Sequence, residues 1–462
     1  MPGNARRIVI VTWHFPPSEE IGGKIVWRLA KALAASGCDV RVLTPPVSEI
    51  LHRDDGYARE MPPRLRVVRS GMGSDVVGAA ARFVRGLRSR RAQSPAPAEA
   101  SAATAATPSP ARRASRMRAL AATFAAWMPQ RRDRWVAVGA KALRDLLAEE
   151  PADLVLSVSP AFQAHEVVLH ARNGLGGARW FAWLHDPGAH YVHASGFIAD
   201  RPLLERLQYH RRSAIEQRVF VSADRMLVTT PELAGVYAAF LPELDAPLVT
   251  PCGFDPAEFP RPSLHPRGQK LVIVHVGTIY QQRTPRPIVE SLARLRALGR
   301  YAPGEVEMEF VGRLENEEGK QLGSIIETLG MSDVVKFIPQ VSQAEALRIV
   351  SDADVGLVLA PGQPMQVPAK IFEYIGLRRP VLAVSDGATS ALVRDTGIGY
   401  ACEQHELDAV LDDLLSTWRD GRLDHFGPAL DRAARRYDIS TIARGLVDEV
   451  ERGHATPTLT AP

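Results

Sequence analysis

Short apolar runs alternate with longer amphipathic stretches along most of this chain. Ile8 to Thr12 is a β-branched run, residues 25–33 repeat apolar side chains at helical spacing, and Asp39 to Leu43 is a second apolar run. A strand, a helix and another strand in this order make a βαβ unit, whose strands lie parallel in one sheet. The N-terminal region therefore predicts a parallel α/β sheet.

The same alternation continues toward the C-terminus. Further strands are predicted at Leu154 to Val158, Trp180 to Leu184 and Met226 to Thr229, and then at Leu271 to Val276, Val306 to Val311, Val334 to Ile338, Val355 to Leu359 and Pro380 to Val384. Six prolines and two glycines between Ala246 and Gln269 separate the two sets and mark a domain boundary. We expect an α/β fold with two doubly wound, Rossmann-like domains facing each other across a cleft.

The chain length agrees with two domains, because 462 residues exceed what one hydrophobic core usually supports. The expected units are an N-terminal domain over 1–250, a linker over 251–269, a C-terminal domain over 270–427, a helix over 428–453 that could pack back on the N-terminal domain, and a flexible tail over 454–462. Each domain would then bury a core of its own.

Residues 79–134 interrupt the N-terminal domain with a basic segment. Twelve arginines face two acidic residues between 80 and 134, in a chain of net charge +4. Residues 93–111 hold no aromatic or large aliphatic side chain, so we expect them to be disordered. A basic amphipathic helix is predicted over 114–128. The residues that define this basic helix and its flank are Arg112, Arg113, Arg116, Met117, Leu120, Phe124 and Trp127.

Composition narrows the class of protein further. No window approaches the roughly 18 consecutive apolar residues of a transmembrane helix, and the N-terminus lacks a signal-peptide pattern, so we expect a cytoplasmic protein. The three cysteines are far apart, which argues against disulfides and a zinc site. Asp352 and Asp354 have the spacing of a metal-binding pair, but they precede the amino end of a predicted strand. We therefore expect no bound metal.

Ligands of doubly wound sheets bind at the carboxyl ends of the strands, so the loops after the predicted strands are the candidate sites. Four loops carry unusual residues: His14 to Lys24 with Gly22 and Gly23, Trp183 to Gly188 with His185 and Asp186, Val276 to Thr284 with Gly277 and Arg283, and Val367 to Pro380 with Lys370 and Glu373. Paired glycines at a helix start suit an anion, and an arginine can clamp a diphosphate. A His-Asp pair can bind polar groups or accept a proton.

The last of these loops predicts the most specific geometry. Pro368 can occupy the first turn of a helix, which would place Lys370 and Glu373 one turn apart on one face. The helix start would then face phosphates, and the carboxylate would lie beside sugar hydroxyls. Each loop also has an ordinary structural interpretation: a flexible turn, an Asp-Pro turn, a surface arginine, and a surface Lys/Glu pair.

Together these segments resemble the GT-B glycosyltransferases, specifically family 4, over nearly the whole chain except residues 79 to 134. The segments that carry the resemblance occur in the family's order: IVTWHFPPSEEIGGKIVWRLAKALAASGCDVRVLTP, SVSPAFQAH, WFAWLHDP, PCGFDPAEF, VHVGTIYQQR, FIPQVSQAEALRIVSDADV and VPAKIFEYIGLRRPVLA. The resemblance implies a GT-B fold and a retaining, metal-independent transferase. It also implies a nucleotide-diphosphate sugar in the C-terminal domain and an acceptor in the N-terminal domain.

The resemblance also implies roles for single residues. It places the nucleotide's ribose on Glu373, the diphosphate on Arg283 and the glycine loop at Gly22 and Gly23. The remaining assignments are His185 and Asp186 at the sugar site as catalytic candidates, Gly277, Thr278 and Lys370 in the donor site, and Gln340 with Val341 at the nucleobase. Two positions depart from the family pattern: Met365 stands where a glutamate is usual, and Thr278 stands where an arginine is usual.

The resemblance gives the basic segment a possible role, because acceptors in the family are often lipid-linked. An arginine-rich amphipathic helix could lie on an anionic membrane surface, which would make the protein peripheral on the inner face of the membrane and suggests cell-envelope polysaccharide biosynthesis. The alternative is that the helix packs on its own domain. Nucleic acid is not an expected partner, since few aromatic residues are interleaved with the arginines.

Two other functions fit the same sequence. One is a nucleotide-sugar epimerase or hydrolase of the same fold, which needs no acceptor. The other is a glycosyltransferase-like protein that binds without turnover, which the departures at Met365 and Thr278 would suit. The sequence leaves these alternatives open.

Overall fold

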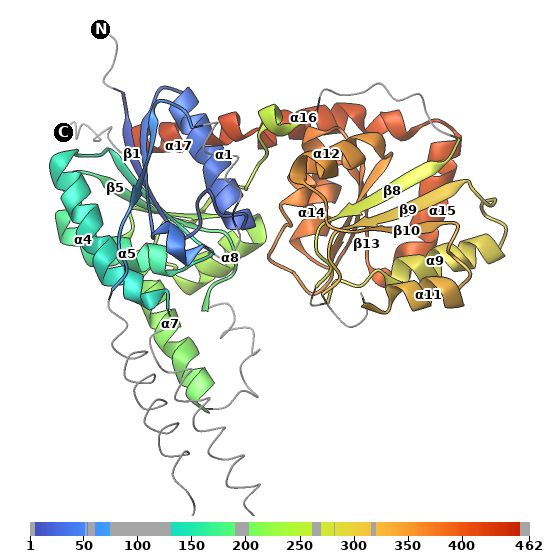
Figure 1. Cartoon of the computed structure of the whole chain (residues 1–462), viewed down its shortest axis with the longest axis horizontal. Coiled ribbons are helices and arrows are strands. Elements are labelled where there is room, and N and C mark those ends of the chain that lie inside the picture. The colour runs from blue at the N-terminus through green and yellow to red at the C-terminus, as the bar shows by residue number, and fades with distance from the viewer. Residues whose placement is uncertain are drawn as a thin grey trace, which may run out of the picture.

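The computed structural model describes residues 5–50, 53, 61–73, 131–189, 203–260, 269–280, 282–315 and 320–452. Within them the chain forms two parallel β-sheets, each covered by helices, which lie side by side (Figure 1). This arrangement confirms the predicted α/β fold class with two doubly wound domains. The residues of the predicted basic helix over 114–128 lie outside the described residues.

The N-terminal sheet has the strand order β3-β2-β1-β4-β5-β6-β7. Its strands are β1 Arg7–Thr12, β2 Asp39–Thr44, β3 Leu65–Arg69, β4 Leu154–Val158, β5 Arg179–Leu184, β6 Arg225–Val228 and β7 Leu248–Val249. Its helices are α1 Ile21–Ala35, α4 Asp133–Glu149, α5 Gln163–Ala171, α7 Leu203–Ser222 and α8 Pro231–Phe240. The central strands are buried along their length, because helices cover both faces.

The C-terminal sheet has the strand order β10-β9-β8-β11-β12-β13. Its strands are β8 Leu271–Val276, β9 Val306–Val311, β10 Val335–Ile338, β11 Val355–Ala360, β12 Val381–Ser385 and β13 Gly399–Cys402. Its helices are α9 Arg286–Ala297, α11 Leu322–Thr328, α12 Gln343–Asp352, α13 Lys370–Gly376, α14 Ala388–Thr396 and α15 Leu407–Arg419. Asp354 supports this sheet, since its carboxylate accepts a 2.8 Å hydrogen bond from the backbone of Val272.

The last helical region differs from the prediction, because it is two helices rather than one. Helices α16 Gly427–Tyr437 and α17 Ile439–Arg452 meet at Asp438, whose backbone is extended. Figure 1 shows α17 beside α1 of the N-terminal domain, while α16 lies toward the C-terminal domain. One buried cluster, which includes Leu29, Phe254, Ile371 and Tyr437, therefore runs between the two domains. None of the helices in the described ranges is both long and apolar enough to cross a bilayer.

Candidate functional site

The carboxyl ends of the strands form the candidate site in both domains. In each sheet the strand order reverses beside the first strand of the domain, so β1 lies between β2 and β4, and β8 lies between β9 and β11. The loops after such a pair diverge and leave a crevice for a ligand. In the C-terminal domain these are the loops 277–285 and 361–369. The first holds the predicted donor residues Gly277, Thr278 and Arg283, and the second leads into helix α13, which holds Lys370 and Glu373.

Gly277 ends β8 in a backbone conformation that favours glycine, with a φ of 122°. A Cβ atom at this position would lie 3.0 Å from Nζ of Lys370. The absence of a side chain therefore lets the lysine ammonium reach the end of the strand. Nζ of Lys370 also lies 3.0 Å from Nε2 of His275, a fully buried strand residue. Thr278 follows as a half-buried residue of the same loop.

Arg283 approaches the same region from the loop after β8. Its Nη2 donates a 3.1 Å hydrogen bond to Oε1 of Gln363, and its guanidinium lies 4.4 Å from the ring centre of Tyr280. Burial lowers the pKa of Arg283. Burial and the nearby Arg283 also lower the pKa of Lys370 well below its usual value, against an opposing effect of Glu373. Two cationic groups held this close would be stabilised by an anion between them.

Glu373 lies in the short helix α13, which begins at Lys370 rather than at Pro368. The predicted helix start at Pro368 is wrong by two residues, because the backbone before Lys370 forms a turn in which Ile371 donates to the Pro368 carbonyl. Oε1 of Glu373 accepts a 2.9 Å hydrogen bond from Nη2 of Arg28 on α1. The carboxylate thus lies at the contact between the two domains.

His185 and Asp186 follow β5 in the N-terminal domain. The backbone N–H of His185 donates to Oγ of Ser159 at 2.8 Å. The imidazole packs edge-on against Trp183, with the two ring centres 4.3 Å apart. Burial lowers the pKa of His185 to about 3, so the ring is neutral at physiological pH. Neither ring nitrogen has a hydrogen-bond partner in the part of the chain that the structure describes.

Asp186 makes a direct link between the domains. Its Oδ1 accepts a 2.7 Å hydrogen bond from Nε2 of Gln366, which lies in the loop before α13. Burial raises the pKa of Asp186, and the bond from Gln366 acts in the opposite direction. The structure therefore brings the predicted His-Asp pair beside the donor loop.

Met365, in place of the usual glutamate, strengthens the same link. Its carbonyl accepts a 2.8 Å hydrogen bond from Oγ1 of Thr230, at the start of α8. Its side chain packs against the buried hydrophobic cluster of the N-terminal domain that includes Leu233 and Tyr237. A glutamate there would place a carboxylate against apolar groups, so this position serves packing between the domains.

Other predicted residues lie apart from this contact. Gly22 and Gly23 are buried in the first turn of α1, where a Cβ on Gly22 would lie 2.8 Å from Pro160. The N–H of Gly23 donates to the Glu20 carbonyl, which gives these glycines a packing reason as well as the predicted one. Gln340 is exposed and Val341 is half-buried in the loop after the edge strand β10. The seven residues of the basic helix and its flank fall outside the described residues.

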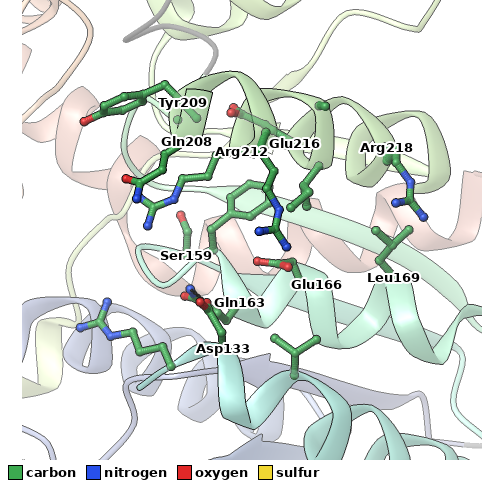
Figure 2. A pocket seen from close by; sticks show the side chains of 18 of the residues that line it. Asp133, Ser159, Gln163, Glu166, Leu169, Gln208, Tyr209, Arg212, Glu216 and Arg218 are labelled. Atoms are coloured by element: carbon green, nitrogen blue, oxygen red, sulfur yellow. Dashed lines mark hydrogen bonds between the residues drawn. The ribbon is translucent and has the colours of Figure 1, made fainter. Parts of the chain in front are cut away.

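A cavity of about 970 Å³ opens in the N-terminal domain beside Asp186. Side chains of α5, among them Gln163 and Glu166, face side chains of α7, among them Gln208 and Arg212 (Figure 2). Burial and the nearby Asp133 raise the pKa of Glu166. This cavity was not predictable from the sequence pattern, because α7 shows no apolar face that would indicate how it packs.

Sequence reasoning also missed Arg28, His275 and the side chain of Gln366. A signal existed for the first two, because Arg28 interrupts the apolar run of α1 and His275 interrupts the apolar strand β8. A polar side chain within a buried pattern is an informative deviation. For Gln366 no comparable signal existed, since it lies in a loop of mixed polarity.

The chain is similar in sequence to bacterial proteins named D-inositol 3-phosphate glycosyltransferase. The protein from Mycobacterium sp. (strain KMS) is 26% identical over 267 residues, which cover 54% of this chain and 58% of the relative. The protein from Stackebrandtia nassauensis is 27% identical over 290 residues, which cover 58% of this chain and 64% of the relative. The chain thus spans less than two thirds of the length of these relatives. No family profile matches the chain.

Several solved structures share the whole fold. Sucrose-phosphate synthase from Thermosynechococcus elongatus matches with a TM-score of 0.63 at 16% identity, over 97% of this chain and 99% of that one. HepE from Anabaena, solved in complex with UDP, matches with a TM-score of 0.59 at 12% identity, over 97% and 100%. WaaG, a glycosyltransferase involved in lipopolysaccharide biosynthesis, matches with a TM-score of 0.56 at 16% identity, over 96% and 99%. The chain therefore has the GT-B fold that its sequence predicted.

Proposed function

We propose that this chain is a glycosyltransferase that moves a sugar from a nucleotide-diphosphate sugar to an acceptor. The single observation that carries the proposal is the convergence of Gly277, Arg283 and Lys370 at the end of β8, beside the loop whose Gln366 is bonded to Asp186 of the other domain. Support comes from the named glycosyltransferases that the chain resembles and from HepE, which has been solved with UDP and with UDP-glucose.

In this proposal the C-terminal domain binds the donor. Arg283 and Lys370 neutralise the diphosphate, and they stabilise the charge that develops on it as the bond to the sugar breaks. Glu373 binds the ribose hydroxyls, and the loops that hold Gln340 and Val341 frame the base. Because two cationic side chains perform this task, the proposed reaction needs no bound metal.

The N-terminal domain would bind the acceptor in the cavity between α5 and α7. This cavity is lined by Asp186 and Ser159, so an acceptor in it would lie next to the proposed sugar position. His185 and Asp186 would orient the sugar or the attacking hydroxyl, and the anomeric configuration would be retained. A lipid-linked or polysaccharide acceptor, presented at an anionic membrane surface to the arginine-rich segment, is our proposed substrate class.

A donor screen with the full chain tests this function. The protein is incubated with uridine, guanosine and adenosine diphosphate sugars, with and without a polyprenyl-phosphate-linked saccharide, and both nucleotide release and sugar identity are followed. Acceptor-dependent nucleotide release that Arg283→Met abolishes supports the proposal. A sugar that changes without acceptor would indicate the epimerase alternative, and acceptor-independent release a hydrolase. Nucleotide binding with no turnover would indicate a non-catalytic protein.

A further inference from the structure

Arg28 is a fully buried arginine at the contact between the two domains. It lies on α1 of the N-terminal domain, between the buried side chains of Trp27 and Leu29, and its exposed fraction is 0%. A buried guanidinium is unfavourable unless carboxylates pair with it. Because Arg28 lies among the buried apolar residues of α1, we expect its guanidinium to be paired with carboxylates.

Two carboxylates from beyond the N-terminal sheet surround Arg28. Nε and Nη2 of Arg28 donate to Oε2 of Glu258 at 2.9 Å and 2.6 Å, and Nη2 also donates to Oε1 of Glu373 at 2.9 Å. Glu258 is held further by Nε2 of Gln343 at 3.1 Å. Burial alone would lower the pKa of Arg28, but Glu373 and Glu258 raise it above its usual value. Arg28 is therefore a permanent cation that bridges α1, the segment after β7 and α13.

The contact uses only one of the two oxygens of Glu373. Among the described residues, the side-chain hydrogen bonds of Glu373 involve Oε1 alone, and the side chain is 19% exposed. One oxygen is thus fixed by Arg28, while the other is available to accept hydrogen bonds from a ligand. A carboxylate held in this way loses little conformational freedom when a ligand binds.

We propose that Arg28 is a positioning residue of the donor site, which fixes the Glu373 carboxylate so that Oε2 can accept hydrogen bonds from the ribose hydroxyls of the nucleotide. The donor is then recognised across the domain contact, because a residue of the N-terminal domain completes a binding site of the C-terminal domain. This inference rests on the proposed function, which assigns the ribose to Glu373.

A purely structural role for Arg28 is the alternative, and Lys31 provides the matched control. Lys31 lies one turn further along α1, and its Nζ pairs with Oδ2 of Asp255 at 2.8 Å and approaches Glu258 at 3.9 Å. It therefore joins α1 to the same segment as Arg28 does, but it does not contact Glu373. Loss of Lys31 weakens the same connection and leaves the carboxylate of Glu373 in place.

The test compares nucleotides with and without ribose hydroxyls. Affinities of uridine, guanosine and adenosine diphosphates are measured by calorimetry for the wild type, and the nucleotide that binds most tightly is kept together with its 2′,3′-dideoxy analogue. Arg28→Met should weaken binding of the natural nucleotide about ten- to a hundredfold, as expected for a lost charged hydrogen bond. It should change the affinity of the dideoxy analogue little. Arg28→Lys should restore part of the affinity, and Lys31→Met should leave both affinities unchanged.

The Glu373→Gln background completes the experiment. If Arg28 acts through Glu373, Arg28→Met should add little to the effect of Glu373→Gln in the double variant. Equal losses for the natural and the dideoxy nucleotide would overturn the inference and indicate a structural role. If Arg28→Met does not fold, Arg28→Lys must still lose more affinity for the natural nucleotide than for its dideoxy analogue. A wild type that binds none of the three nucleotides would instead contradict the proposed function itself.

Discussion

Nζ of Lys370 lies 3.0 Å from Nε2 of His275, at the end of the first strand of the C-terminal domain. Nδ1 of the same imidazole lies 3.1 Å from the carbonyl oxygen of Leu357 on the neighbouring strand. Burial lowers the pKa of His275 well below its usual value, and the ammonium of Lys370 lowers it further. The lysine pKa is lowered as well. The pair therefore holds fewer protons than the same two side chains would hold in water.

Nucleotide binding should accordingly take up a proton at this pair. A diphosphate beside Lys370 favours the charged amine and raises its pKa, so up to about one proton is taken up between the pKa values of the free and bound forms. Apparent affinity should rise as pH falls through that window. Calorimetry in buffers of different ionisation enthalpy, at a series of pH values below the ordinary lysine pKa of about 10.4, measures the uptake. It should be reduced in Lys370→Met and unchanged in Lys141→Met, whose side chain is 72% exposed on α4. An undiminished uptake in Lys370→Met would contradict this role.

Glu373→Ala should weaken nucleotide binding severely, because it removes the proposed ribose acceptor and leaves the buried Arg28 without one of its two carboxylates. Calorimetric titration with the nucleotide chosen in the donor screen measures the loss. Glu290→Ala, in the exposed Arg286–Glu290 pair of α9, is the control and should bind as the wild type does. An unchanged nucleotide affinity in Glu373→Ala would contradict the assignment of Glu373 to the donor site.

The cavity between α5 and α7 can be tested by filling it. Ala137 is an exposed residue of α4 that lines the cavity, so Ala137→Trp places a large ring there without disturbing the core. Acceptor-dependent turnover should fall at least about tenfold, while nucleotide affinity stays unchanged. Ala148 is exposed on the same helix and does not line the cavity. Ala148→Trp should therefore leave both turnover and nucleotide affinity unchanged. Full turnover in Ala137→Trp would place the acceptor elsewhere.

The sequence predicted the central strands better than the edges of the sheets. Leu154–Val158 and Leu271–Val276 have the predicted bounds, because strands covered on both faces are almost continuously apolar. Val306–Val311 also has the predicted bounds, although Glu307 and Glu309 interrupt its apolar pattern. The strands that were missed, β3, β7 and β13, lie at or beside open edges, where polar residues and short length weaken the pattern. Edge position alone does not explain these omissions, because the edge strand β10 was predicted to within one residue; short length and polar residues are the added cause.

The candidate site was predictable for a related reason, and only in part. Parallel strands bring their carboxyl ends to one edge, so loops such as those with Asp186 and Arg283 could be identified from the strand pattern alone. The pairing of Arg28 with Glu373 and of Asp186 with Gln366 depends on how two domains meet. Local periodicity carries no information about that contact.

Buried histidines should make the N-terminal domain sensitive to acid. Burial lowers the pKa of His165 to about 3 and, with Arg132, that of His14 to about 4, and burial lowers the pKa of His185 to about 3. The unfolded chain binds protons on these groups below about pH 6.5, whereas the folded chain does not until pH 3 to 4. Stability therefore falls as pH decreases from about 6.5, by about 1 to 2 kcal/mol for each histidine on reaching pH 5.

His165→Gln isolates one of these contributions. Denaturant unfolding followed by tryptophan fluorescence at pH 6.5 and pH 5 should show a smaller loss of stability in this variant than in the wild type, by about 1 to 2 kcal/mol. The hydrogen bond of His165 Nδ1 with Oγ of Ser157, at 2.7 Å, is lost or replaced equally at both pH values, so it cancels in the comparison. His405→Gln, whose side chain is 75% exposed, should lose as much stability as the wild type. An equal loss in His165→Gln would mean that the His165 ring titrates alike in the folded and unfolded chains.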